Sequence, residues 1–149
     1  MVLYKDLIFL NTDFKDKFEI FNFISNILIK KNFVVDNYFE ELVIREKNFP
    51  TGLDLGFTSI AIPHCDAKNA YVDTLYFIRN NNSIIFENIE DGNDINTKLI
   101  IGIVISNPKN QVETLTKLIS IFQNKELMYI LENEKNIDKI YDILNINIK

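Results

Sequence analysis

The run KLIIGIVI at residues 98–105 decides the fold class of this 149-residue chain. Its β-branched residues favour a strand, and since apolar residues follow Lys98 without alternation, we expect both faces of this strand to be buried. A strand that is buried on both faces needs a covering layer above and below its sheet. The run therefore predicts an α/β domain in which helices cover both faces of a sheet.

Other segments of the chain also have the composition of strands. TSIAIP at 58–63 must end as a strand at Pro63, because proline cannot donate a hydrogen bond to a sheet. TLYFIR at 74–79 and SIIF at 83–86 follow it, and a first strand or turn is expected at residues 7–10. We therefore predict a mixed sheet of about five strands.

Two helices are predicted before the first of the central strands. Apolar residues recur at helical spacing from 14 to 28, with Asp13 placed to cap the start of this helix. A second helix is expected from about Asn37 to Glu46, with Asp36 as its cap. Both helices place apolar residues on one face, as helices that cover a sheet require.

Three more helices are predicted after the run at 98–105. The first has its amino-terminus near Gln111, after a loop that contains Pro108. Two short helical patterns follow at 126–131 and 137–144. Strands interleaved with helices at both ends of the chain predict one layered α/β domain over residues 1–149.

Composition excludes several classes of partner. The net charge of −5 disfavours binding to nucleic acids, which requires a basic surface. A membrane-spanning helix needs about 20 apolar residues, and the longest apolar runs, such as LIIGIVI at 99–105, are far shorter. The amino-terminal residues do not form a signal peptide. We therefore expect a soluble, cytoplasmic protein that does not insert into a membrane.

The chain contains one histidine, His64, and one cysteine, Cys65. These are too few ligands for a structural zinc site, so we expect no metal and no cofactor. Consecutive side chains of an extended chain point to opposite faces, so the two residues form a poor nucleophile and base pair. We expect Cys65 to be a small buried hydrophobic residue.

A phosphoryl carrier is the chemistry that one histidine can support alone. There is no second histidine for a serine triad, and the four glycines match no nucleotide-binding spacing. A neutral imidazole can accept a phosphoryl group and release it again. The bound anion needs donors, such as a guanidinium or the start of a helix, and Arg45 and Gln111 are the candidates. A lone histidine is nevertheless more often structural.

The stretch REKNFPTGLDLGFTSIAIPHCDAKNA at 45–70 resembles the active-site segment of type-2 enzyme IIA domains of sugar phosphotransferase systems. Those domains carry an Arg-Glu pair, a Thr-Gly pair and then an apolar residue before Pro-His, in which the histidine is phosphorylated. The run at 99–122 resembles the last central strand of that family and the helix that follows its active-site loop. The matching motif residues are Arg45, Glu46, Thr51, Gly52, Pro63 and His64.

The resemblance is to the galactitol-like branch, through FPTG, PHCDA and Gln111. Several other branches have a second histidine at that last position. A glutamine can donate a hydrogen bond to a phosphate oxygen but cannot balance its charge, so Arg45 would carry more of that task. Thr51 either hydrogen-bonds the phosphate or is a turn residue between Pro50 and Gly52.

The resemblance implies a phosphotransferase. His64 would take a phosphoryl group from the phosphohistidine of the carrier protein HPr and pass it to a cysteine of the cognate enzyme IIB. The membrane component IIC would be an indirect partner, through IIB, during sugar uptake. The family favours Nε2 (the tele nitrogen) as the acceptor, which requires Nδ1 to be tied to another group. Two alternatives stay open: a nitrogen-type regulatory IIA module, and an inactive interaction domain in which His64 accepts no phosphate.

Overall fold

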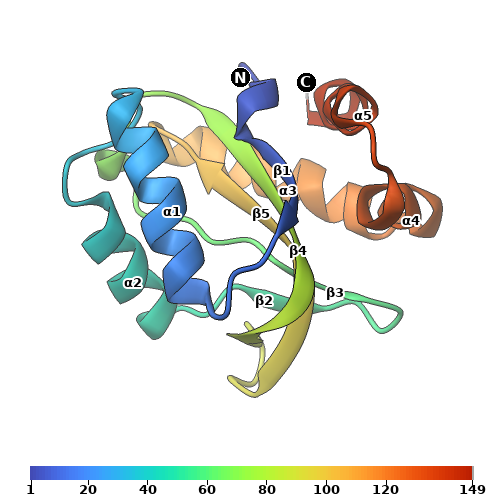
Figure 1. The fold of residues 1–149 in the computed structure, drawn as a ribbon. Helices are drawn as coiled ribbons and strands as arrows, with labels where there is room; N and C mark the ends of the chain where they lie inside the picture. Colours follow the sequence, from blue (N-terminus) through green and yellow to red (C-terminus); the bar gives the residue numbers. More distant parts are fainter. Residues whose placement is uncertain (149) are drawn as a thin grey trace.

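A five-stranded sheet with the order β1-β4-β5-β3-β2 forms the middle layer of the computed structural model, which describes residues 1–148 (Figure 1). The pairs β1·β4 and β3·β5 are parallel, while β4·β5 and β2·β3 are antiparallel. The predicted mixed sheet is therefore confirmed. The strands are β1 (Ile8–Thr12), β2 (Gly52–Asp54), β3 (Ser59–Ala61), β4 (Thr74–Glu87) and β5 (Asp94–Val104).

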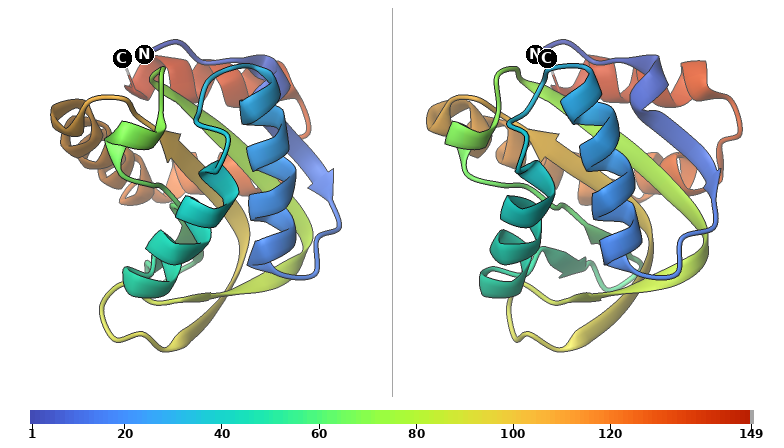
Figure 2. Two further views of the ribbon diagram at one scale, coloured as in Figure 1. Left: turned by 90° about the vertical axis from the view of Figure 1, so that its left-hand side faces the viewer. Right: turned by 60° about the vertical axis from the view of Figure 1, so that its left-hand side comes forward.

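Helices cover both faces of this sheet, as the sequence predicts (Figure 2). One face carries α1 (Lys17–Lys30) and α2 (Tyr38–Asn48). The other carries α3 (Pro108–Phe122), α4 (Lys125–Asn133) and α5 (Ile137–Ile148). Two short 3₁₀ helices, η1 (Lys5–Leu7) and η2 (Ala67–Asn69), complete the described elements. None of the helices within residues 1–148 combines the length and the apolar character that crossing a membrane demands.

β5 contributes to the apolar cores on both sides of the sheet. Leu99, Ile101 and Ile103 join the core under α3, α4 and α5. Ile100 and Val104 alternate with them and join the core under α1 and α2. All five side chains are buried, which confirms that this strand has two buried faces.

Gly102 interrupts the large side chains of β5 for a steric reason. The ring of Tyr76, on the neighbouring strand β4, lies across the backbone of Gly102. A Cβ atom at this glycine would come within 1.8 Å of the Tyr76 Cζ atom. Any larger residue would therefore displace this buried ring from the central pair of strands.

Two helix caps differ from the prediction. Helix α1 is capped by Asp16, whose carboxylate accepts from the Glu19 N–H, and not by Asp13. Asp13 instead accepts a hydrogen bond from the Asn81 side chain at 2.9 Å. Helix α2 is preceded by Asn37 and not by Asp36, and the Asn37 side chain makes no cap hydrogen bond.

Helix α3 starts earlier than its apolar pattern indicates. It begins at Pro108, where the sequence places the amino-terminus near Gln111. The Asn107 side chain accepts a hydrogen bond from the Lys109 N–H and so caps the helix before the first apolar residue. Gln111 thus lies in the first turn of α3 and not at its start.

The strand pattern differs at two places. The segments predicted as strands at 74–79 and 83–86 are one strand, β4, with an irregularity in its pairing between Arg79 and Ile84. The buried Asn80 side chain keeps this polar stretch in the sheet, because it bonds Thr12 and Phe14. Strand β2, which has only three residues, is not predicted from the sequence.

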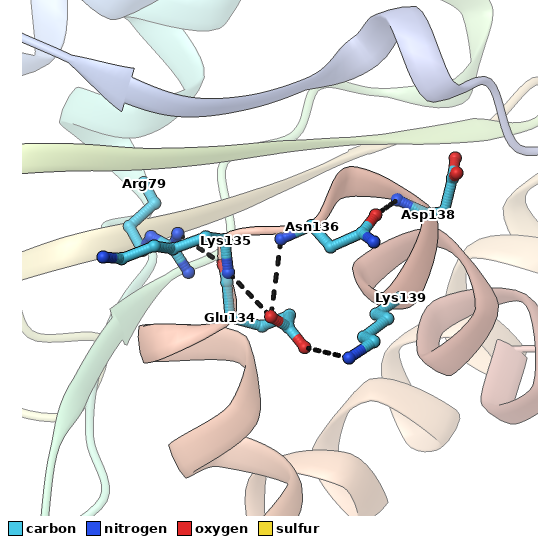
Figure 3. Close-up of polar contacts among 6 residues, drawn as sticks. All are labelled: Arg79, Glu134, Lys135, Asn136, Asp138 and Lys139. Carbon is cyan, nitrogen blue, oxygen red and sulfur yellow. Dashed lines mark hydrogen bonds and ion pairs between the residues drawn. The ribbon is translucent and has the colours of Figure 1, made fainter.

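Arg79 ties the end of α4 to the sheet (Figure 3). Its guanidinium donates to the carbonyl oxygens of Leu131 at 3.0 Å and Glu134 at 2.6 Å. The Glu134 carboxylate accepts from the Lys135 N–H at 2.8 Å and pairs with Lys139 at 3.5 Å. The last carbonyls of a helix have no partner within it, so Arg79 satisfies groups that would otherwise be left unpaired.

Replacing Arg79 should therefore destabilise the fold. We expect Arg79→Ala to lower the free energy of unfolding by about 1–3 kcal/mol, because two carbonyl groups lose a charged donor. Urea denaturation followed by circular dichroism measures this change. Lys98→Ala is the matched control, since Lys98 is an exposed cation on the adjacent strand β5. Equal losses in the two variants would contradict this role for Arg79.

Candidate active site

His64 lies just beyond the end of β3, fastened to the central strand of the sheet. Pro63 precedes it and accepts a hydrogen bond from the Ile103 N–H at 3.0 Å, and His64 itself forms a bridge with Ile103. The His64 residue is only 8% exposed. The sheet therefore holds the histidine ring in a defined position at its surface.

The two ring nitrogens of His64 have different surroundings. Nδ1 lies 2.7 Å from the carbonyl oxygen of Ile62. A carbonyl oxygen only accepts hydrogen bonds, so Nδ1 carries the hydrogen and Nε2 keeps its lone pair. Burial lowers the pKa of His64, and the Arg45 guanidinium adds to this, while the Ile62 bond and Asp66 act in the opposite direction. The ring is therefore a neutral imidazole with a nucleophilic Nε2 at neutral pH.

A hollow of about 390 Å³ opens beside His64. Its wall combines the end of α2 and the following turn with residues of α3 and of the loop after β4. It therefore joins parts of the chain that are far apart in sequence. The lining residues are Arg45, Asn48, Phe49, Pro50, Thr51, Ile62, His64, Ile89 and Leu115.

Arg45 is the cation among the residues that line this hollow. It lies in the last turn of α2, half-buried, with its Nε 3.8 Å from the Asp66 carboxylate. Its Nη1 donates to the Phe49 carbonyl oxygen at 3.4 Å, and its Cζ lies 4.5 Å from the centre of the Phe49 ring. A guanidinium has five N–H donors, so most of them are free to turn toward an anion.

Gln111 reaches the same region from α3. Its Nε2 donates to the carbonyl oxygen of Cys65 at 3.0 Å. Cys65 directly follows His64, so this bond brings the Gln111 amide to the backbone beside the histidine. An amide nitrogen carries two hydrogens, so a second one remains for another acceptor. The structure thus brings Arg45, Thr51 and Gln111 to the surroundings of His64.

Thr51 is almost fully buried and is held by a carboxylate. Its N–H donates to Glu46 Oε2 at 2.8 Å, and its hydroxyl donates to Glu46 Oε1. A hydroxyl has one hydrogen, so Thr51 cannot donate to a second group in this arrangement. Burial raises the pKa of Glu46, although the two hydrogen bonds from Thr51 act in the opposite direction.

No individual role for Glu46 is predicted from the sequence, where it is only one of the motif residues. The available signal was its spacing, because Tyr38, Leu42 and Glu46 are four residues apart and so share one face of a helix. All three are buried in the structure. A carboxylate on the apolar face of a helix is rare unless other groups hold it.

Cys65 is buried, as predicted, with 5% exposure. Burial raises the pKa of its thiol to about 12. The nucleophilic form of cysteine is the thiolate, which is nearly absent at neutral pH when the pKa is so high. The thiol therefore acts as a small packing group beside the site.

Exposed apolar residues border the hollow. Phe49 and Ile89 line it and are 62% and 50% exposed, and Val112 on α3 is 67% exposed. Ile62, in contrast, is buried. Phe57 is exposed but lines a different hollow with residues of α4, where Lys125 contacts its ring. The exposed apolar residues that line the hollow are thus Phe49 and Ile89.

Residues 1–146 match the family described as "Phosphoenolpyruvate-dependent sugar phosphotransferase system, EIIA 2". The chain belongs to this family. The galactitol-specific EIIA component of Escherichia coli (strain K12) is 34% identical over 118 residues, which are 79% of each chain. The mannitol-specific EIICBA component of Buchnera aphidicola subsp. Baizongia pistaciae (strain Bp) is 30% identical over 141 residues, which cover 93% of this chain and 21% of that longer protein.

Solved structures of this EIIA family have the same fold. The nitrogen regulatory protein IIA-Ntr of Neisseria meningitidis aligns with a TM-score of 0.80 and 27% identity over 96% of both chains. The mannitol IIA of Escherichia coli aligns with a TM-score of 0.77 and 24% identity over 97% of this chain and 99% of that one. The same mannitol IIA is also solved in complex with phosphorylated IIB. These similarities confirm the predicted α/β fold.

The burial of His64 predicts its titration. We expect the pKa of folded His64 to lie below the usual imidazole value of about 6.5, because burial and Arg45 disfavour the imidazolium. An NMR titration of the imidazole signals measures it, with the urea-unfolded chain as the reference.

The same shift predicts how stability depends on pH. Folded His64 binds fewer protons than unfolded His64, so its contribution to stability is lost as pH falls below about 6.5. His64→Gln should remove this part of the dependence. A folded pKa at or above that of the unfolded chain would contradict the account of the site.

Proposed function

We propose that this EIIA protein is the phosphocarrier of a galactitol-like sugar phosphotransferase system. His64 accepts the phosphoryl group of phospho-HPr on Nε2 and passes it to a cysteine of the cognate enzyme IIB during sugar uptake. The observation that carries this proposal is the hydrogen bond from Nδ1 to the Ile62 carbonyl oxygen, because it leaves Nε2 as the nucleophilic nitrogen. The family membership and the galactitol-specific relatives support the pathway.

Both transfers are in-line displacements at phosphorus. The Nε2 lone pair forms the new N–P bond while the N–P bond of the donor breaks and its electron pair returns to the donor imidazole. A thiolate of IIB then forms an S–P bond, and the electron pair of the broken bond returns to Nε2. Positioning and charge stabilisation supply most of the catalysis in such reactions, so neither step needs a cofactor.

We assign the stabilisation of the phosphoryl group mainly to Arg45. A phosphoryl group adds a charge of about −1.5 to −2 near neutral pH, and a guanidinium binds its oxygens in a bidentate way. The present contacts of Arg45 with Asp66 and Phe49 are long, so the side chain can exchange them for the stronger anion. Gln111 supplies a neutral donor from α3, and Thr51 supports the site through its link to Glu46.

The surroundings of His64 suit partners that bind in turn. Exposed apolar residues beside a reactive group favour small, transient protein interfaces. We propose that the exposed side chains of Phe49 and Ile89 contact HPr in one step and IIB in the next. The solved complex of the mannitol IIA with phosphorylated IIB supports IIB as the acceptor. The membrane component IIC is then served only through IIB.

A nitrogen-type regulatory IIA module is the second candidate, because IIA-Ntr of Neisseria meningitidis aligns with a TM-score of 0.80. In that case the phosphorylation state of His64 would control other proteins. Transfer of the label from the phosphorylated chain to a galactitol-type IIB, but not to an IIB that lacks its cysteine, supports the carrier. Phosphorylation of His64 without transfer to such an IIB supports the regulatory module.

Phosphorylation of His64 tests the proposal. We expect the purified chain to gain one phosphate when it is incubated with phosphoenolpyruvate, enzyme I and HPr from its own organism. Intact-mass measurement detects it, and acid treatment should remove it, as for a phosphohistidine. His64→Ala should gain none. An unmodified wild-type chain would refute the carrier and favour an inactive interaction domain.

Arg45 should be required for the rate of this reaction. We expect Arg45→Gln to slow phosphorylation by about 10- to 100-fold, because the transition state loses its charged donor. Rapid-quench kinetics with phospho-HPr measures the rate. Lys47→Gln is the matched control, since it removes one exposed charge from the same helix. Equal rates for Arg45→Gln and Lys47→Gln would show that Arg45 does not contribute to the rate of phosphorylation.

A further inference from the structure

A buried carboxylate in α2 is connected to His64 by a series of hydrogen bonds. Glu46 is 2% exposed, and both of its oxygens accept hydrogen bonds from Thr51. The Thr51 carbonyl oxygen accepts from the Ile62 N–H at 3.1 Å. The Ile62 carbonyl oxygen accepts from His64 Nδ1 at 2.7 Å. Each residue in the series therefore holds the next one.

The series ends on the atom that sets the reactivity of His64. The Ile62 carbonyl oxygen keeps the hydrogen on Nδ1 and so leaves the lone pair on Nε2. If this oxygen moved, the ring could rotate or carry its hydrogen on Nε2, which would block attack by that nitrogen. Thr51, which fixes Ile62, lines the same hollow as His64.

Glu46 has a clear local task, because the buried N–H and hydroxyl of Thr51 would lack acceptors beside an apolar side chain. A buried carboxylate is costly to desolvate and is found mainly where hydrogen bonds satisfy its oxygens. The nearby charges oppose each other, since Lys17 lowers the pKa of Glu46 and Glu87 raises it. The carboxylate provides two oxygens that hold both donors of Thr51 at once.

We propose that Glu46 is a positioning residue for phosphoryl transfer, which acts through Thr51 and Ile62 to keep Nε2 of His64 unprotonated and oriented. This inference rests on the proposed function, in which Nε2 is the phosphoryl acceptor. Glu46 does not touch the phosphoryl group. It acts on the maximal rate of the transfer and not on the binding of the donor protein.

Glu46→Gln tests the proposal with little change in shape. A glutamine keeps one acceptor oxygen for the Thr51 N–H, while its NH₂ group faces the Thr51 hydroxyl, which must then accept and can no longer donate to residue 46. Glu40→Gln is the matched control, because Glu40 is an exposed glutamate in the first turn of the same helix. The two variants lose the same charge at positions of opposite burial.

Two readouts separate positioning from simple destabilisation. Nitrogen-15 NMR of the His64 imidazole reports which nitrogen carries the hydrogen, without any phosphorylation. Single-turnover kinetics at varied phospho-HPr concentration separates the maximal rate from the half-saturating concentration. In Glu46→Gln we expect a measurable Nε2–H population and a maximal rate lowered by about tenfold, with half-saturation unchanged. Glu40→Gln should match the wild type in both readouts.

Variants at Thr51 extend the test to the case in which Glu46→Gln does not fold. Thr51→Ser keeps the hydroxyl and should match the wild type, while Thr51→Val removes it and should reproduce the change in tautomer and rate. Where all variants fold, the effects of Glu46→Gln and Thr51→Val on the rate should be non-additive, because both variants change the same contact between residues 46 and 51.

The possible failures can be told apart. A folded Glu46→Gln variant with the wild-type tautomer and rate would overturn the positioning role and leave the carrier function intact. If Glu46→Gln does not fold, a Thr51→Val variant that behaves like Thr51→Ser would overturn it. A wild-type chain that gains no phosphate would overturn the proposed function, and the NMR comparison would still decide whether Glu46 sets the tautomer.

Discussion

The burial of β5 on both faces is the constraint from which the arrangement of the site follows. Its alternating side chains belong to two separate cores, so the strand cannot shift without disturbing both helical layers. Ile103 of this strand holds Pro63 and His64 through the backbone. The helix that follows β5 carries Gln111 to the carbonyl of Cys65. His64 is thereby attached to a strand that is buried on both faces.

The site combines the neutral imidazole of His64 with the charged guanidinium of Arg45, which has only long contacts. Burial keeps the His64 imidazole neutral, and the Ile62 carbonyl oxygen decides which nitrogen can react. Arg45 is held only by long contacts at the rim, so its charge is available when a phosphoryl group arrives. Glu46 lies buried behind Thr51 and not on the open side of the hollow. Backbone contacts thus orient the ring, and in the proposed reaction the Arg45 guanidinium would balance the added charge.

The sequence predicts those features that depend on local pattern. The continuous apolar run of β5 indicates its two buried faces, and Pro63 indicates the strand end that His64 follows. Features that depend on distant partners are not readable in this way. Asn80 to Asn82 resemble a turn, but Thr12 and Phe14 keep Asn80 within β4. The bond of Gln111 to Cys65, 46 residues away, likewise arises only when the chain is folded.

The central claim is that Nε2 of His64 is the phosphoryl acceptor, and the most direct test is to locate the phosphoryl group on the ring. The chain would be labelled with nitrogen-15 in histidine, phosphorylated through HPr and observed by NMR, where coupling to phosphorus identifies the substituted nitrogen. We predict coupling to Nε2 alone, with the hydrogen remaining on Nδ1. Coupling to Nδ1 would contradict the account, because that nitrogen would first have to release the carbonyl oxygen of Ile62.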